Sequence, residues 1–128
     1  MISRALIAVA VVEWEGQVLV GPRPAGVPLA GLWEFPGGKA QPGETPAHAA
    51  VRECLEETGL AVVVVSEYPA HAHTYEHGQV DLRFFACRPL ASDLAPRAPF
   101  RWVERRALAQ LEFPAGNQSL LALLGLAE

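Results

Sequence analysis

The sequence predicts a mixed α and β fold, either α+β or a three-layer α/β/α sandwich, built as one domain over residues 1–128. Three observations favour this class. A β-rich apolar run near the N-terminus is typical of a buried strand, and a well-capped helix is expected at 46–58. Strands and helices alternate without the regularity of βαβ units. With 51% hydrophobic and 19% charged residues, 128 residues can form one domain with a buried core, but a second domain with its own core would not fit.

The first part of the chain predicts a β-hairpin followed by a loop. The run Ala5–Val12 is apolar throughout, residues 13–17 indicate a turn, and Val18–Val20 returns as the second strand. Residues 21–31 are rich in proline and glycine, which favours a loop. A short extended segment at Trp33–Phe35 is expected to end at the proline-glycine-glycine that follows it.

The central helix is predicted over residues 46–58. Thr45 is a typical N-cap, Pro46 suits the first helical position, and Gly59 supplies the left-handed residue that ends many helices. On a helical wheel, one arc of about 100° is expected to face the core. Its members are Ala47, Val51, Cys54, Leu55 and Thr58.

The second part of the chain predicts further strands and two helices. The strands are expected at Leu60–Val65, Ala70–Tyr75, Val80–Cys87 and Phe100–Val103, with a loop at Pro89–Pro99. The helices are expected at Glu104–Leu111 and, from its leucine spacing, at Asn117–Leu126.

Three glutamates share another arc of the central helix. Glu53 lies three residues before Glu56 and four before Glu57, a spacing at which like charges destabilise a helix by about 0.2–0.5 kcal/mol per pair. A solvated acidic face is the ordinary explanation. A bound cation would remove the penalty, and clustered carboxylates select hard ions such as Mg²⁺ or Mn²⁺. The position near the helix C-terminus, Arg52 beside Glu56, and a glycine-rich turn upstream favour the cation.

The spacing of these residues resembles a complete Nudix box over residues 38–60. Gly38 is followed after five residues by Glu44, and after seven more by the run Arg52-Glu53-Cys54-Leu55-Glu56-Glu57-Thr58-Gly59-Leu60. Every polar and glycine position of the family pattern is filled. Cys54 is a mild departure, because isoleucine, leucine or valine is usual there.

This resemblance implies a Nudix-type α/β/α sandwich with a mixed β-sheet, and hydrolysis of nucleoside diphosphates linked to a further group. Glu53, Glu56 and Glu57 would bind Mg²⁺, with Mn²⁺ as a substitute, and Glu53 would also take a proton from the attacking water. A carbonyl of Gly37 or Gly38 would be a further ligand. Arg52 would orient a carboxylate, and Glu44 would support the loop and helix or help bind metal.

Outside the box, residues 32–39 and 113–117 are similar to MutT-type 8-oxo-dGTP pyrophosphohydrolases and the related CTP pyrophosphohydrolases. Arg23 matches a phosphate-contacting arginine of these enzymes, and Asn117 matches their purine-reading asparagine. Arg23 is otherwise a surface residue, and Asn117 is otherwise the cap of the last helix. Phe35 is a stacking residue or part of the core, and Lys39 contacts phosphate or covers the loop.

Some positions depart from the MutT-type pattern. Pro96 stands where a further metal-binding glutamate is common, and Asp93 is the nearest substitute. Gly78 replaces a hairpin arginine that some of these enzymes use against the oxidised base. A loose group of histidines, His71, His73 and His77, indicates either a transition-metal site or, more simply, a solvent-facing hairpin.

The expected function is Mg²⁺-dependent hydrolysis of nucleoside triphosphates to monophosphate and pyrophosphate. Sanitation of 8-oxo-dGTP is the first choice of substrate, cytidine triphosphates come second, and other nucleoside-diphosphate-linked substrates come third. A non-catalytic nucleotide-binding module is expected to have lost acids that are present here. A plain interaction domain would leave the spacing of the box unexplained.

Composition narrows the possible partners and compartment. A net charge of −4 argues against binding of a nucleic-acid duplex but is compatible with a nucleotide held through a metal ion. The two cysteines, Cys54 and Cys87, indicate a reduced cytoplasmic setting and are expected to be buried and inert. No stretch approaches the length of a membrane span, the N-terminal run is interpreted as a strand and not a signal peptide, and a monomer or homodimer is expected.

Overall fold

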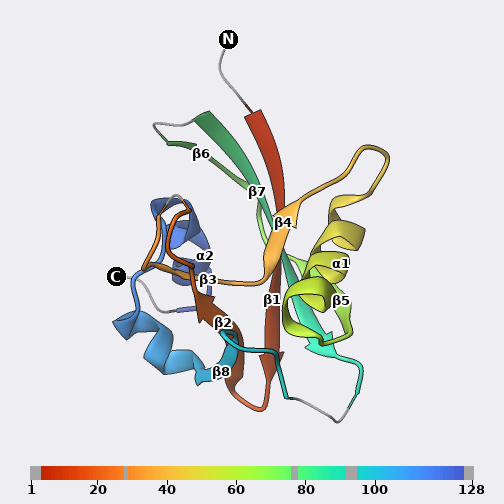
Figure 1. Ribbon diagram of the computed structural model, residues 1–128, viewed down its shortest axis with the longest axis vertical. Coiled ribbons are helices and arrows are strands. Elements are labelled where there is room, and N and C mark those ends of the chain that lie inside the picture. Colours follow the sequence, from red (N-terminus) through yellow and green to blue (C-terminus); the bar gives the residue numbers. More distant parts are fainter. Residues whose placement is uncertain (1–3, 28, 76–77, 92–94, 126–128) are drawn as a thin grey trace.

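The computed structural model describes residues 4–27, 29–75, 78–91 and 95–125 (Figure 1). The strands are β1 (Arg4–Trp14), β2 (Gln17–Pro22), β3 (Trp33–Glu34), β4 (Gly37–Lys39), β5 (Val62–Glu67), β6 (His71–Tyr75), β7 (Gly78–Pro89) and β8 (Arg101–Glu104). The helices are α1 (Pro46–Thr58) and α2 (Gln118–Leu123), with two 3₁₀ helices, η1 (Arg105–Gln110) and η2 (Ala115–Asn117).

The sheet is mixed and is built around β1 and β7. These two strands run parallel, in register from Arg4 opposite Gln79 to Val12 opposite Cys87. The sheet order is β3-β2-β1-β7-β5; β4 pairs with β1, β6 pairs with β7, and β8 pairs with β2. The predicted mixed sheet is therefore confirmed.

Helices cover both faces of the sheet, which produces two cores. Along β1, Ala8, Ala10 and Val12 point into a core with α1, whereas Val9 and Val11 point into a core with η1 and α2. Figure 1 shows α1 on one side of the long central strands and α2 on the other. Successive side chains of a strand point to opposite faces of the sheet. An unbroken apolar run therefore predicts a strand that is buried on both faces, as β1 is.

The interior of α1 differs from the predicted arc. Leu55, expected in the core, is 49% exposed, whereas Ala49 and Ala50 are completely buried. The helix packs against β4 as well as β1 and β5, and β4 was not predicted because it lies in the Pro-Gly-Gly region expected to end the extended segment. Burial by β4 moves the covered side of the helix toward the glutamates and leaves Leu55 outside.

Two predicted helices were also imprecise. Residues 105–110 form a 3₁₀ helix, which suits a short connector better than a full α-helix. The last helix begins at Gln118, because Asn117 ends η2, and its predicted end at 126 lies outside the described residues. Among the described residues, none of the helices has the length and apolar character needed to cross a membrane.

Candidate active site

Helix α1 is fixed at both ends by the residues that the sequence indicated. The Thr45 side chain accepts a hydrogen bond from the His48 backbone N–H at 3.2 Å. Gly59 adopts φ 78°, a left-handed conformation that glycine takes without steric cost, and its N–H donates to the Leu55 carbonyl. Because both ends of the helix are fixed, the positions of its glutamates along β4 are fixed as well.

Two glycines allow the helix and the sheet to approach this closely. A Cβ on Gly37 would lie 2.5 Å from the Ala8 carbonyl oxygen, so β4 can pair with β1 only if this residue is glycine. A Cβ on Gly38 would lie 2.0 Å from the Glu53 carboxylate. The Gly37 N–H also donates to Glu57 Oε1 at 2.8 Å. Both glycines therefore contribute to where the glutamates lie.

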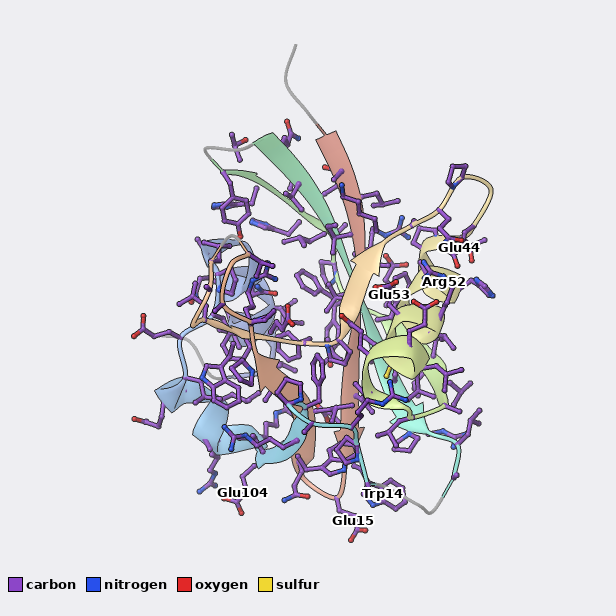
Figure 2. All side chains as sticks on the ribbon, viewed as in Figure 1. Trp14, Glu15, Glu44, Arg52, Glu53 and Glu104 are labelled. Carbon is purple, nitrogen blue, oxygen red and sulfur yellow. The ribbon has the colours of Figure 1, made fainter. Side chains whose placement is uncertain are left out.

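Arg52 is the centre of the charged network. Its guanidinium donates two hydrogen bonds to Glu44, at 2.7 and 3.0 Å, in the bidentate geometry that makes such pairs strong. It also donates to Glu53 at 2.7 Å and to Glu56 at 3.2 Å. Figure 2 shows Glu44, Arg52 and Glu53 gathered along one side of α1. Arg52 thus orients three carboxylates, where one was expected.

Glu44 is fully engaged in holding the loop before α1. Besides the two bonds from Arg52, it accepts one from the Gln41 backbone N–H at 3.0 Å and lies 2.7 Å from the His48 ring. The hydrogen bonds from Arg52 lower the pKa of Glu44 to about 2. This geometry favours the first of its two expected roles, support of the loop and helix, over metal binding.

Glu57 stands in a different electrostatic environment. Burial raises its pKa to about 7, since desolvation outweighs the stabilising hydrogen bond from Gly37, and the nearby charges of Glu34, Glu53 and Glu56 act in the same direction as burial. A cation bound beside Glu57 would stabilise its ionised form against both burial and the neighbouring negative charges.

The donor chemistry fits a hard divalent cation. The candidate ligands are all oxygens: the carboxylates of Glu53, Glu56 and Glu57, and the carbonyls of Gly37 and Gly38. Among the described residues, no three aspartate, glutamate, histidine or cysteine side chains lie close enough together to bind a metal ion without rearrangement. Glu53 and Glu56 are instead paired with Arg52, so a bound cation would compete with the guanidinium for their oxygens.

A cavity of about 470 Å³ lies beside this charged region. All four predicted substrate-binding residues line it: Arg23, Phe35, Lys39 and Asn117. Gly37 and Gly38 form part of the same wall, and the back of the cavity is apolar, with Ile7, Val9, Val80 and Leu82. The three metal-binding candidates of α1 are not among the lining residues, but Glu53 and Glu57 contact the glycines that are.

The substrate-binding candidates differ in how they are held. Arg23 donates to Glu34 at 2.8 Å, so it is not a simple surface arginine. Phe35 is only 5% exposed and stacks on Phe113 with ring centroids 5.1 Å apart, so it belongs to the core while one part of it reaches the cavity. The Asn117 side chain makes no capping hydrogen bond to α2, which removes the capping alternative.

The sequence did not single out two further residues of the cavity. Glu34 pairs with Arg23, and burial raises its pKa. Tyr75, from β6, accepts a hydrogen bond from the Gly116 N–H at 2.8 Å. The alternation of side chains along a strand predicts which face of β6 carries Tyr75. It does not predict the contact with Gly116, which lies 41 residues later in the chain.

The departures from the family pattern also have defined places. Gly78 lines the cavity, and Pro96 lies next to Arg97, which donates to the Glu56 carbonyl at the end of α1. His71 and His73 are half-buried, with ring centroids 5.9 Å apart. His77 and Asp93 lie outside the described residues. Both cysteines are free and buried, and burial raises the pKa of each thiol.

The comparison with protein families matches a NUDIX domain over residues 8–123. An 8-oxo-dGTP diphosphatase of Escherichia coli is 29% identical over 121 residues, covering 92% of this chain and 94% of the enzyme. An 8-oxo-dGTP diphosphatase of Buchnera aphidicola is 32% identical over 73% of this chain and 77% of the enzyme. A CTP pyrophosphohydrolase of Escherichia coli is 40% identical over 58% of this chain, but the match spans only 54% of that enzyme.

Solved structures agree with the fold. The solution structure of the E. coli ORF135 protein superposes with a TM-score of 0.73 at 27% identity, covering 94% of this chain and 88% of that one. A MutT protein from Methanosarcina mazei superposes with a TM-score of 0.79 at 23% identity, covering 95% and 93%. The expected family and its sandwich fold are thereby confirmed, and the chain belongs to the Nudix hydrolase family.

Proposed function

We propose that this chain hydrolyses nucleoside triphosphates to a monophosphate and pyrophosphate with Mg²⁺, or Mn²⁺ in its place, and that it acts on oxidised purine nucleotides such as 8-oxo-dGTP. One observation carries this proposal. The same cavity is lined by Gly37 and Gly38, which contact Glu57 and Glu53, and by Asn117. We call the part beside the two glycines the charged end and the part beside Asn117 the base end. A nucleoside triphosphate carries charge on its phosphates and hydrogen-bonding groups on its base, and these residues suit both.

At the charged end, Glu53, Glu56, Glu57 and the carbonyls of Gly37 or Gly38 would hold the cation. Once bound, the cation would neutralise phosphate charge and lower the pKa of a coordinated water. Arg52 keeps Glu53 in place through the 2.7 Å hydrogen bond. Arg23 and Lys39, which line the cavity, supply positive charge for the phosphates.

In the proposed chemical step, Glu53 acts as the general base. Its carboxylate takes a proton from water as the water oxygen bonds to the phosphorus that carries the nucleoside. The bond from that phosphorus to the bridging oxygen breaks, and pyrophosphate leaves with the electron pair. Glu53 suits this role because its side chain lies directly against Gly38 in the cavity wall and is only 20% exposed.

At the other end, Asn117 would read the base. An amide offers one donor group and one acceptor, which matches the edge of an oxidised purine. Phe35 and the apolar back wall would contact the ring. By removing oxidised nucleotides from the cytoplasmic pool, the enzyme would keep them from being incorporated into DNA.

Cytidine triphosphates are the second candidate substrate. The relative with 40% identity over 74 residues is named a CTP pyrophosphohydrolase. Gly78, which lines the cavity, supplies no side chain against an oxidised base. A smaller pyrimidine would then be recognised by Asn117, with Phe35 against its ring.

The test is kcat/KM with Mg²⁺ for 8-oxo-dGTP, dGTP, CTP and dCTP, with the products separated by chromatography. The proposal expects 8-oxo-dGTP to be preferred at least about tenfold, with monophosphate and pyrophosphate as products and no turnover in excess chelator. A preference for cytidine nucleotides would replace the substrate by the second candidate. No turnover of any of the four would overturn the proposal.

A further inference from the structure

The Gly116–Asn117 segment is anchored to the rest of the molecule at three points. On one side, Phe113 stacks on Phe35 with centroids 5.1 Å apart. On the other side, Leu120 and Leu121 of α2 are buried in the core. Between them lies a polar contact with a distant strand, in which the Gly116 N–H donates to the Tyr75 hydroxyl oxygen at 2.8 Å.

This polar contact lies one residue before Asn117, the residue proposed to read the base. Gly116 directly precedes Asn117, and both Tyr75 and Asn117 line the cavity. The two apolar anchors fix the ends of the segment, and within it the Asn117 N–H donates to the Pro114 carbonyl at 2.9 Å. The hydrogen bond to Tyr75 ties the Ala115–Gly116 peptide in front of Asn117 to β6.

Side chains pack closely around Gly116. A Cβ on Gly116 would lie 2.7 Å from the Tyr75 oxygen and 2.7 Å from Leu82 Cδ1, so a larger residue would push these two side-chain ends away. On the same face of β6, the His73 ring lies tilted against Tyr75 with centroids 4.5 Å apart, and His71 stacks on His73. The Tyr75 ring therefore packs against a row of two histidine rings along β6.

We propose that Tyr75 is a positioning residue for base selectivity, because its hydroxyl holds the Ala115–Gly116 peptide directly before Asn117 and the His73 ring packs beside its own. The inference rests on the proposed function of Asn117 and adds to it the element that sets the amide's position. It also gives the two described histidines of the hairpin a role in place of a metal site. Tyr75 does not touch the reacting atoms, so its removal affects recognition of the base and not the chemical step.

The test is the substitution Tyr75→Phe, which removes one oxygen and keeps the ring. We expect KM for the preferred nucleotide to rise about tenfold, the change that 1.4 kcal/mol produces, while kcat stays within about twofold. The ratio of kcat/KM between 8-oxo-dGTP and CTP should fall by a similar factor. Turnover of 2-deoxyribose 5-triphosphate, which lacks a base, should not change.

The matched control is Tyr68→Phe, the same change at the chain's other tyrosine, which packs beside the second core and does not line the cavity. It should leave all these ratios at the wild-type value. A second lesion, Gly116→Ala, should reproduce the loss of selectivity. It should cost less in the Tyr75→Phe background, because the oxygen that meets the new methyl group is gone.

Amide hydrogen exchange supplies a readout that does not depend on activity. In Tyr75→Phe the Gly116 amide should exchange at least about tenfold faster, with the melting temperature within a few degrees of wild type. Unchanged exchange, or an unchanged ratio between bases in an active variant, would overturn the inference alone. Wild-type protein that turns over no nucleotide would overturn the proposed function as well.

Discussion

The two ends of the cavity are built in opposite ways. Apart from Arg23, the charged end comes from one continuous stretch, residues 37–57, and is held by at least four hydrogen bonds from Arg52 to the carboxylates around it. The base end joins β6 to η2 across 41 residues through the hydrogen bond from the Gly116 N–H to Tyr75. The proposed chemistry therefore depends on residues close together in the chain, whereas the proposed selectivity depends on a contact between distant segments.

The largest effect is expected from a change at the charged end. Glu57→Gln keeps the acceptor for the Gly37 N–H but removes the negative charge that would bind the cation. We expect kcat to fall by about 10³-fold or more with the melting temperature nearly unchanged, measured with saturating Mg²⁺. Glu104→Gln, at an exposed glutamate far from α1 in Figure 2, is the matched control. Activity within a few-fold of wild type in Glu57→Gln would remove this residue from the site.

The two neighbouring glycines should separate folding from catalysis. Gly37→Ala places a methyl group 2.5 Å from a backbone oxygen, which cannot move without breaking the β1–β4 pairing, so the protein should be severely destabilised. Gly38→Ala meets the end of the Glu53 side chain, which can move away. We expect Gly38→Ala to remain folded by circular dichroism while kcat falls about 100-fold. Equal losses of stability in both variants would contradict this distinction.

At the base end, Asn117→Ala should have a smaller and more selective effect. We expect the ratio of kcat/KM between 8-oxo-dGTP and CTP to change by about tenfold, because one amide contact is lost. The dependence of the rate on Mg²⁺ concentration should stay as in wild type. An unaltered ratio would exclude Asn117 from base recognition, and an altered metal dependence would show that the two ends are coupled.

The smallest expected effect concerns stability and pH at Glu44. Its pKa is about 2 in the folded protein, below the ordinary value of 4.5, because it accepts hydrogen bonds from Arg52. Its ionised form therefore stabilises the fold fully above about pH 4.5, and this contribution disappears as the pH falls toward 2. Glu44→Gln should melt a few degrees below wild type at pH 7, and the two proteins should converge near pH 2. A constant difference in melting temperature across this range would contradict the assignment.

The sequence was informative where the structure depends on residues close together in the chain. Thr45 and Gly59 set the ends of α1 through contacts within four residues, and the acidic arc follows from helical spacing. Local pattern was also enough for the central strand, whose apolar run requires cover on both faces.

The same reasoning failed where a distant segment decides burial. Leu55 is exposed because β4, a strand of three residues in a proline-glycine turn, covers a different side of α1. Tyr75 and Glu34 escaped notice because their partners lie on other elements. Such pairings depend on how the strands are ordered in the sheet, and composition and periodicity carry no information about that order.

The parallel pairing of β1 with β7 has a consequence for synthesis of the chain. The ribosome makes β1 long before β7, so the most apolar strand of the sheet waits for the partner that covers nine of its residues in register. Only the short pairings with β2 and β4 and the packing of α1 are available to it earlier. Contacts so far apart in sequence form slowly, and an unpaired apolar strand invites aggregation. The nascent protein therefore has reason to depend on chaperones until residue 89 has emerged.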